Sequence, residues 1–323
     1  MITKRVGLGI LGLGNIGSGT YKVLEQNRDH IETVTGLDLR ITGILEIDQD
    51  RDRGFTVPPY LFKKDPEIIF SDPGTDIVIE LLGGTEPATT FMVNAMNAGK
   101  SVVTANKAAL AENYELLTET AVKNGVELRF EASVGGGIPI IGAIRDHLAA
   151  NEFTEMLGIL NGTTNYILTK MTESGRSYED ALAEAQKLGF AEADPASDIE
   201  GRDVAHKLSI LMSLVFGKRV KPHEIPTTGI SNITEQDINE AEAEGCVIKL
   251  LASAFRSEGG IECFIQPTFL NKSHPLADVR NEYNALYIKG SAVGDLMLYG
   301  KGAGPYPTAS AVLGDVITIA RKI

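Results

Sequence analysis

The sequence predicts an α/β protein in which a Rossmann-type, doubly wound parallel sheet is accompanied by a second, α+β domain. Three observations indicate this fold class. Short apolar runs such as Val6–Leu11 and Ser101–Thr104 alternate with helical segments in the first half of the chain, as in a parallel sheet. The turn Gly12–Gly17 joins the first run directly to a helix, an order typical of Rossmann-type domains. Beyond residue 136, strands with hairpin spacing predict a different class of domain.

The length of 323 residues is ample for two domains with separate cores. We assign a dinucleotide-binding domain to residues 1–135 and expect a C-terminal helix over residues 304–323 to return and complete it. Residues 136–303 are assigned to a substrate-binding and dimerisation domain.

Composition disfavours several classes of protein. Hydrophobic residues make up 43% and charged residues 23% of the chain, which is typical of soluble globular proteins. The net charge of −13 argues against a nucleic-acid partner and against binding to anionic membranes. Cys246 and Cys263 are the only cysteines, so no disulfide framework is expected. No apolar run is long enough to span a membrane, and we expect a cytoplasmic protein.

The glycine turn after the first strand predicts a phosphate site. Gly12 permits the tight turn, Gly14 lets the backbone approach a pyrophosphate, and Gly17 allows close packing of helix on strand. Amides at the start of the helix, around Asn15 and Ile16, offer N–H groups and a positive dipole to an anion. Because strand, turn and helix follow in this order, cofactor binding is favoured over a purely structural turn.

The second strand, Leu39–Leu45, is followed by acidic residues. We assign Asp48 as the side chain that accepts a hydrogen bond from a ribose hydroxyl, although its distance from the glycines exceeds the usual ~20 residues. Arg51 and Arg53 follow directly, either to pair with a 2′-phosphate or as solvated loop charges. The sequence therefore does not decide between NAD and NADP as the cofactor.

Two further strands lead into candidate cofactor residues. The run Asp76–Leu82 is followed by Gly83, and Ser101–Thr104 is followed closely by Lys107. Ligands bind outside the carboxyl ends of such strands, so Gly83 and Lys107 are assigned to the cofactor site, with a solvated helix-start lysine as the alternative. The first half is expected to close with a helix over Glu112–Asn124 and a strand over Glu127–Glu131.

The second half begins at a glycine-rich junction, Val134–Pro139, which would serve as a hinge or as a carbonyl-lined cation site. From the residues alone, the hinge is favoured. The turn Asn161–Asn165, with Gly162 and Thr163, suits a polar substrate and equally suits helix capping. The elements expected here are a helix over Ile140–Ala150, a strand over Met156–Leu160, a hairpin of Cys246–Arg256 with Ile261–Phe269, strands over Glu282–Lys289 and Leu296–Tyr299, and a last helix over Thr308–Lys322.

An acidic loop precedes the helix that carries the main catalytic candidate. The loop and the helix start supply Glu192, Asp194, Asp198, Glu200 and Asp203, and Lys207 follows one helical turn after Asp203. On a helical wheel this last pair lies at the edge of a buried face. An isolated pair of this kind is worth only ~0.3–0.5 kcal/mol. Together with the acidic loop, it indicates a pocket for a cationic, polar substrate with a proton donor in its wall.

Five sequence blocks in this order resemble homoserine dehydrogenase over essentially the whole chain: SVVTANKAAL, EASVGGGIPII, NGTTNYILTKM, GFAEADPASDIEGRDVAHK and YGKGAGPYPTASAVLGDV. The resemblance implies a reversible, NAD- or NADP-dependent reduction of L-aspartate 4-semialdehyde to L-homoserine, in the biosynthesis of threonine, methionine and isoleucine. It is consistent with the homodimer expected from the sheet surface of the second domain.

The resemblance also implies roles for individual residues. Lys207 would be the proton donor, and Lys107 would lie between cofactor and substrate. Glu192 and Asp203 would hold the substrate, with Asp198 in the same network. Gly304 would approach the cofactor, and a sodium ion would be ringed by the backbone carbonyls of Glu131, Val134, Gly136 and Ile138.

Two departures from the family pattern stand out. The chain ends at Ile323 without the C-terminal regulatory domain of many relatives, so we expect no threonine feedback through such a domain. His206 stands where an arginine is common.

Two other classes of protein are weighed against the enzyme. A non-catalytic NAD(P)-sensing regulator would need the glycine turn but no acidic pocket, and a scaffold dimer would use Asp203 and Lys207 only as a structural ion pair.

Overall fold

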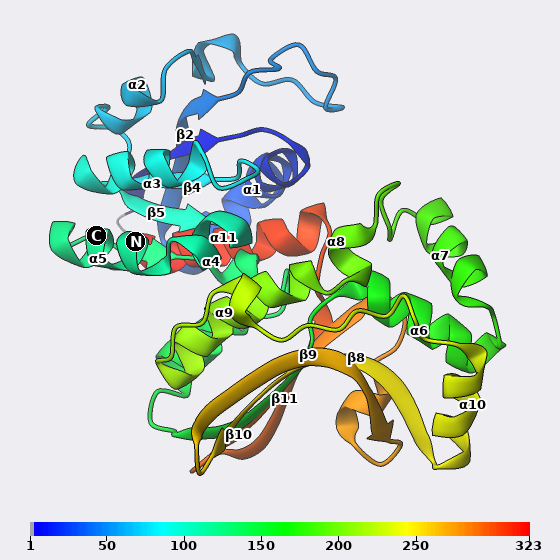
Figure 1. Cartoon of the computed structure of the whole chain (residues 1–323). Helices are drawn as coiled ribbons and strands as arrows, with labels where there is room; N and C mark the ends of the chain where they lie inside the picture. Colours follow the sequence, from blue (N-terminus) through cyan, green and yellow to red (C-terminus); the bar gives the residue numbers. More distant parts are fainter. Residues whose placement is uncertain (1–2) are drawn as a thin grey trace. The chain divides into compact units, whose positions relative to one another are not determined.

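The computed structural model describes residues 3–323 and consists of two compact units (Figure 1). The first unit runs to Gly137 and resumes with Gly304–Ile323, and the second comprises Ile138–Ala303. Among the described residues, no helix is both long enough and apolar enough to cross a membrane.

The first unit is built on a parallel sheet with the strand order β3-β2-β1-β4-β5-β6. This is the order of a doubly wound dinucleotide-binding fold, so the predicted fold class is confirmed. Its strands are β1 (Lys4–Leu11), β2 (Leu37–Leu45), β3 (Phe62–Lys63), β4 (Ile77–Glu80), β5 (Ser101–Thr104) and β6 (Leu128–Arg129). The central strands are buried on both faces, which explains their continuous apolar sequence.

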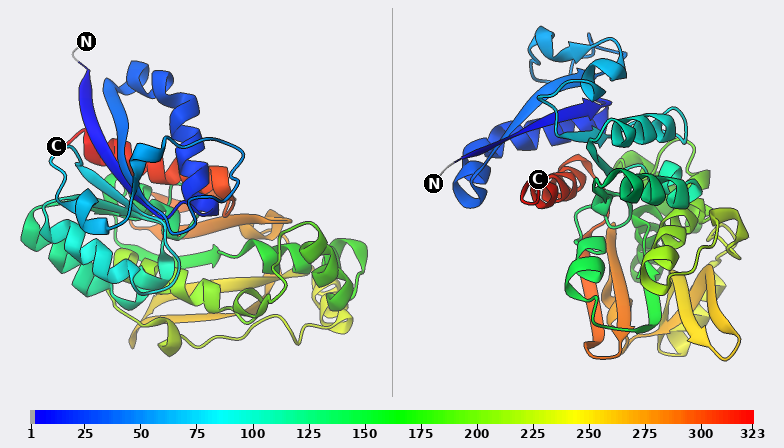
Figure 2. Two further views of the ribbon diagram at one scale, coloured as in Figure 1. Left: turned by 90° about the horizontal axis from the view of Figure 1, so that it is seen from above. Right: turned by 90° about the vertical axis from the view of Figure 1, so that its left-hand side faces the viewer.

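Helices cover both faces of this sheet. They are α1 (Asn15–Thr35), α2 (Pro66–Phe70), α3 (Ala88–Asn97), α4 (Lys107–Glu112), α5 (Tyr114–Asn124) and α11 (Pro305–Ala320), with short 3-10 turns η1 (Pro59–Leu61) and η2 (Glu131–Ser133). The C-terminal helix α11 lies alongside α1 (Figure 2). Helix α1 continues to Thr35, which explains the long spacing between the glycine turn and the end of β2.

The second unit is built on an antiparallel sheet with the strand order β11-β10-β7-β8-β9. Its strands are β7 (Phe153–Ile159), β8 (Cys246–Ser257), β9 (Gly260–Asn271), β10 (Tyr283–Gly290) and β11 (Gly294–Lys301). The predicted hairpin is confirmed as β8 paired with β9. Its helices are α6 (Gly162–Ser174), α7 (Tyr178–Lys187), α8 (Ala196–Ile199), α9 (Arg202–Phe216) and α10 (Glu235–Ala243), with short turns η3 (Ala143–His147), η4 (Pro222–Glu224) and η5 (Pro275–Asp278).

Helices α6, α9 and α10 pack against β8 and lie on one side of this sheet (Figure 1). The register places Leu157, Tyr287 and Met297 opposite one another across β7, β10 and β11, so they share one face. These apolar side chains are only partly buried, in a cluster whose core includes Leu276 of η5.

Two predicted helices differ from the structure. The expected Ile140–Ala150 helix is regular only over residues 141–147, and Ala143–His147 within it is a π-helical turn closed by the Leu148 N–H on the Ala143 carbonyl at 2.9 Å. The expected Glu112–Asn124 helix is broken at Asn113, whose backbone leaves the helical region. Hydrophobic spacing does not register such a local break, because the residues on both sides keep their helical periodicity.

Candidate active site

The glycine turn of the first unit has the geometry of a dinucleotide site. Gly12 adopts φ +93°, a conformation that favours glycine. A Cβ added at Gly17 would lie 2.2 Å from the Gly12 carbonyl oxygen, so this glycine is needed for close packing. A Cβ added at Gly14 would meet no atom of the protein within 4 Å. The residues present therefore leave open space beside the first amides of α1, Asn15 and Ile16, where a phosphate fits.

The acidic residue that contacts this turn is Glu46, immediately after β2. Its Oε2 accepts a hydrogen bond from the Leu13 N–H at 2.6 Å, and its Oε1 accepts one from the Asp48 N–H at 2.9 Å. Asp48, the residue assigned from the sequence, is exposed, and its backbone N–H donates to the Glu46 carboxylate. The assignment from sequence missed Glu46 because an acidic pair two residues apart at a strand end does not reveal which member turns inward.

A buried carboxylate organises the end of β4. Glu80 is fully buried and accepts hydrogen bonds from Thr104 Oγ1 at 2.5 Å and from the Leu82 N–H at 2.7 Å. Burial raises the pKa of Glu80 above its ordinary value, and the hydrogen bonds oppose that rise. The network fixes the chain just before Gly83, where an added Cβ would meet nothing within 4 Å. Sequence reasoning missed Glu80, because a lone carboxylate in an apolar run gave no separate signal.

Asn106 connects this loop to the helix that begins with Lys107. Its Oδ1 accepts a hydrogen bond from the Ala109 N–H at 3.1 Å and caps α4. Its Nδ2 donates to the Gly84 carbonyl at 2.7 Å. Lys107 is therefore held at the carboxyl end of β5, at the edge of the parallel sheet where ligands bind in this fold class.

Gly304 precedes α11 and adopts φ +111°. The next residue, Pro305, packs against α1 so closely that a Cβ added at Gly19 would lie 2.7 Å from the Pro305 carbonyl oxygen. Gly304 is thereby brought near the first turns of α1, which follow the glycine turn.

In the second unit, the Asn161 side chain connects the predicted carboxylates. Its Nδ2 donates to Asp198 Oδ1 at 2.8 Å and to Asp203 Oδ2 at 2.9 Å. Its Oδ1 accepts a hydrogen bond from the Thr164 N–H at 2.9 Å, which caps α6. In the sequence, Asn161 is recognisable only as a polar turn residue, because its capping signal is the same whether or not the amide nitrogen has other partners.

Lys207 and Asp203 form the expected pair on α9. Lys207 Nζ donates to Asp203 Oδ2 at 2.7 Å and to the Leu160 carbonyl at 2.6 Å. Asp203 is 7% and Lys207 8% exposed, so the pair is largely shielded from water. An ammonium has three N–H groups, and these two bonds leave one for an oxygen of a substrate.

The other predicted substrate residues have distinct positions. Thr163 Oγ1 lies 2.7 Å from Asp198 Oδ2 and 2.7 Å from the Phe190 carbonyl oxygen. A hydroxyl has one proton, so it donates to one of these acceptors at a time. A Cβ added at Gly162 would lie 2.8 Å from the Glu282 carbonyl oxygen, so this glycine is required for packing.

Glu192 remains outside the hydrogen-bonded network. It is exposed, and the hydrogen bond recorded for it runs from Gln186 Nε2 to its backbone carbonyl at 3.1 Å. The structure thus brings together Asp198, Asp203 and Lys207 through Asn161, while the Glu192 carboxylate lies on the acidic loop nearby in sequence.

The four residues proposed as carbonyl ligands lie in a buried turn. Glu131, Val134, Gly136 and Ile138 are all buried. The Glu131 N–H donates to Asp315 Oδ2 of α11 at 2.7 Å, and the Ile138 carbonyl accepts a hydrogen bond from the Ile140 N–H at 2.9 Å. Among residues 3–323, no group of three or more His, Cys, Asp or Glu residues could hold a metal ion.

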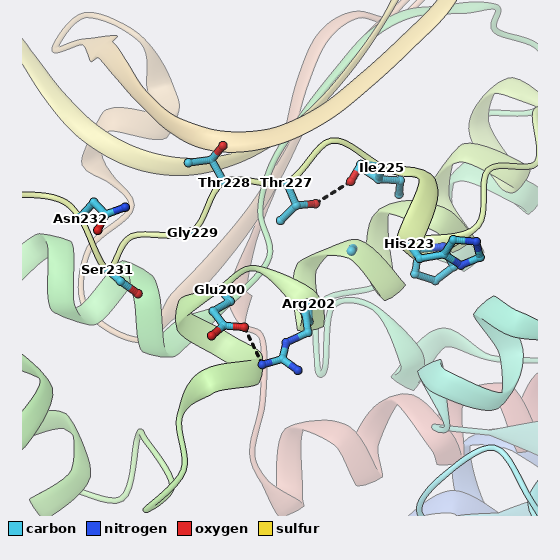
Figure 3. A pocket seen from close by; sticks show the side chains of 11 residues that line it. Glu200, Arg202, His223, Ile225, Thr227, Thr228, Gly229, Ser231 and Asn232 are labelled. Carbon is cyan, nitrogen blue, oxygen red and sulfur yellow. Dashed lines mark hydrogen bonds and ion pairs between the residues drawn. The ribbon is translucent and has the colours of Figure 1, made fainter.

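A cavity of about 580 Å³ lies beside the turn that leads into α9, but it does not include Asp203 or Lys207 (Figure 3). Arg202 and Glu200 form an ion pair at 2.6 Å on one of its walls. The loop around Gly229 also lines the cavity, and a Cβ added at Gly229 would lie 2.2 Å from the Ile199 carbonyl oxygen. This loop therefore packs against Ile199 and Glu200, just before α9 begins.

Comparison with known proteins identifies the family. The model for the homoserine dehydrogenase NAD binding domain matches residues 12–131, and the homoserine dehydrogenase model matches residues 139–317. The chain is 42% identical to the homoserine dehydrogenase of Bacillus subtilis over 320 residues, which cover 99% of this chain and 74% of that protein.

Solved structures agree with this. A homoserine dehydrogenase from Thiobacillus denitrificans has a TM-score of 0.93 at 42% identity, covering 98% of this chain and 74% of that one. A hyperthermophilic archaeal homoserine dehydrogenase in complex with NADPH has a TM-score of 0.82 at 25% identity, and the match covers 99% of this chain and 98% of that one. The matches extend over both units and do not support a non-catalytic regulator. The chain belongs to the homoserine dehydrogenase family, whose members are NAD(P)-dependent oxidoreductases of amino-acid biosynthesis.

Proposed function

We propose that this protein reversibly reduces L-aspartate 4-semialdehyde to L-homoserine with an NAD(P) cofactor, and that Lys207 is the proton donor. The observation that carries the proposal is the hydrogen-bonded network that joins the buried Lys207, Asp203 and Asn161 to the half-buried Asp198. It combines a cation suited to a carbonyl oxygen with carboxylates suited to an ammonium group, and the substrate has both.

The cofactor site is assigned to the glycine turn of the first unit. The open space at Gly14 and the amides of Asn15, Ile16 and Gly17 would receive the pyrophosphate. Gly83, Lys107 and Gly304 are assigned to the same site because each lies at the carboxyl edge of the sheet or beside α1. For the ribose we now assign Glu46 in place of Asp48, since the Glu46 carboxylate contacts the turn.

Lys207 would supply the proton. A reduced dinucleotide held at the glycine turn would supply a hydride to the aldehyde carbon, and negative charge would then develop on the substrate's carbonyl oxygen. That oxygen needs a proton donor within hydrogen-bond reach, an effect typically worth ~10²–10⁴-fold in rate. The ammonium of Lys207 has an N–H to give, while Asp203 and the Leu160 carbonyl orient it. In the oxidative direction, the Lys207 amino group would take the proton from the hydroxyl.

The carboxylates would bind the substrate's amino group. Asp198 and Asp203 are oriented by the Asn161 amide, and their carboxylates carry the charge that attracts an ammonium. Glu192 is proposed as a further contact from the exposed acidic loop. Thr163 acts through Asp198, whose carboxylate it reaches at 2.7 Å.

Two features are proposed for the assembly. The partly buried apolar face around Leu157, Tyr287 and Met297 would pack against a second copy of the chain as a homodimer.

A sodium ion is proposed at the carbonyls of the buried Glu131–Ile138 turn, because hard cations prefer oxygen ligands. A rise in melting temperature with sodium at constant ionic strength tests the ion.

The proposed function is tested by following nicotinamide absorbance in mixtures of protein, L-homoserine and NAD(P)⁺. Lys207→Ala should lower kcat by ~10²–10⁴-fold with cofactor affinity retained, whereas Lys187→Ala on the exposed face of α7 should not change it. Near-parental turnover in Lys207→Ala, with turnover abolished in Lys107→Ala, would assign the donor to Lys107 instead.

A further inference from the structure

Two arginines follow β2, and the structure separates their environments. The Arg53 side chain is 4% exposed, and its Nη2 lies 3.6 Å from Glu46 Oε2. Its Nε donates to the Leu13 carbonyl at 2.9 Å, and its Nη1 donates to the Arg51 carbonyl at 2.9 Å. Arg51, in contrast, is exposed, and its Nη2 donates to Asn15 Oδ1 at 3.3 Å at the start of α1.

The Arg53 guanidinium therefore cannot turn toward a ligand without giving up several hydrogen bonds. Its Nη2 also donates to the Asp48 carbonyl at 2.5 Å. These bonds join the loop after β2 to the glycine turn and hold the positive charge beside Glu46. Arg53 is held beside the glycine turn and acts on Glu46, whose carboxylate accepts a hydrogen bond from the Leu13 N–H of that turn.

The position of this pair bears on cofactor choice. In dinucleotide-binding folds, the residue at the end of the second strand faces the 2′-position of the adenosine ribose. An uncompensated carboxylate there accepts a hydrogen bond from a 2′-hydroxyl and repels a 2′-phosphate. A buried, fixed cation beside that carboxylate lowers the repulsion without touching the phosphate.

We propose that Arg53 sets the cofactor preference by neutralising Glu46, so that the protein accepts the 2′-phosphorylated dinucleotide, with Arg51 as the exposed cation facing the phosphate. The inference rests on the cofactor role proposed above. Asp48, Asp50 and Asp52 on the same loop are exposed, so water and salt screen them far more than they screen the Glu46–Arg53 pair.

The test measures binding of NADPH and NADH to the protein alone by titration of nicotinamide fluorescence, with no second substrate. Arg53→Gln keeps a side chain that can donate to carbonyls but loses the charge. It should weaken NADPH relative to NADH by roughly tenfold, as expected for one uncompensated charge near a phosphate. The control Asp50→Asn, on the same loop, should leave the ratio nearly unchanged.

A double-mutant cycle distinguishes screening from direct contact. In a Glu46→Gln background, Arg53→Gln should no longer change the ratio of affinities, because no carboxylate remains to be neutralised. Arg51→Ala should weaken NADPH in both backgrounds. If Arg53→Gln has the same effect with and without Glu46, Arg53 contacts the phosphate and the proposal is wrong.

Melting curves of the apo variants show whether each folds. If Arg53→Gln melts at a much lower temperature than the parent, Arg53→Lys replaces that variant as the test, because lysine keeps the charge with fewer hydrogen bonds. The proposal requires the parental ratio in this variant, and a ratio changed as in Arg53→Gln overturns it. A protein that binds NADPH as expected but does not oxidise homoserine contradicts the proposed reaction and leaves this inference standing.

Discussion

Asn161 is a single neutral side chain on which the orientation of the charged residues depends. Its amide nitrogen contacts Asp198 and Asp203, while its oxygen caps α6. Asn161→Ser retains a side chain that caps helices well but cannot donate to both carboxylates. We expect a rise in KM for homoserine with a small change in melting temperature.

The kinetics and melting of Asn161→Ser check this prediction. Thr234→Ser, at another helix cap, is the matched control, because its hydroxyl caps α10 away from these carboxylates. An unchanged KM would show that substrate binding does not depend on the contact of the Asn161 amide nitrogen with the carboxylates of Asp198 and Asp203.

The glycines of the phosphate turn differ in what a methyl group would do. A Cβ at Gly14 meets no atom of the protein, and its φ of −69° suits any residue, so Gly14→Ala should fold normally and lose cofactor affinity. A Cβ at Gly17 lies 2.2 Å from the Gly12 carbonyl oxygen, so Gly17→Ala should lower stability by about 1–3 kcal/mol.

Cofactor titration and denaturant unfolding of the two alanine variants check this pair of predictions. Equal losses of stability in both variants would contradict the open space at Gly14. Parental affinity in Gly14→Ala would place the pyrophosphate elsewhere.

At the scale of elements, a buried lysine joins β8 to α6. Lys249 is 4% exposed, and its Nζ donates to Asn165 Oδ1 at 3.0 Å. Burial, with repulsion from Arg280, lowers the pKa of Lys249 from 10.5 to about 8. The unfolded chain therefore holds more protons than the folded protein between these two pH values, so this group makes folding more favourable as pH rises through that window.

Lys249→Met removes this titration while keeping a long side chain. We expect the melting temperature of the parent, relative to that of Lys249→Met, to increase from pH 7 to pH 10. Lys187→Met on the exposed side of α7 provides the control, and its difference from the parent should stay flat. A difference for Lys249→Met that is flat or decreases would show that the folded pKa of Lys249 is not lowered.

At the scale of the whole molecule, the partly buried apolar face of the antiparallel sheet around Leu157, Tyr287 and Met297 predicts a homodimer. Met297 is partly buried on this face, and Tyr299 of the same strand is 50% exposed. A charge placed there would be desolvated in a dimer. Met297→Glu should therefore shift the protein to the mass of a single chain in light scattering, whereas Val122→Glu on α5, where the native side chain is 82% exposed, should not. A parental mass of one chain would contradict the dimer.

Local sequence determined most of the first unit. The apolar runs predict β1, β4 and β5 because a strand buried on both faces needs a largely hydrophobic sequence. Gly12 and Gly17 are recognisable because a positive φ and a close backbone approach exclude other residues. The pairing of Asp203 with Lys207 was also predictable, because side chains four residues apart on a helix lie next to each other.

Tertiary structure alone decided which distant polar groups meet. Asn161 reaches Asp203 across 42 positions and Arg53 reaches the Leu13 carbonyl across 40, and no local periodicity encodes such contacts. The sequence offered Glu46 and Asp48, or Arg51 and Arg53, as equivalent neighbours. In the folded protein, Glu46 and Arg53 point inward, whereas Asp48 and Arg51 are exposed. The direction of a side chain in a loop depends on the carbonyls and amides that the rest of the fold brings close to it.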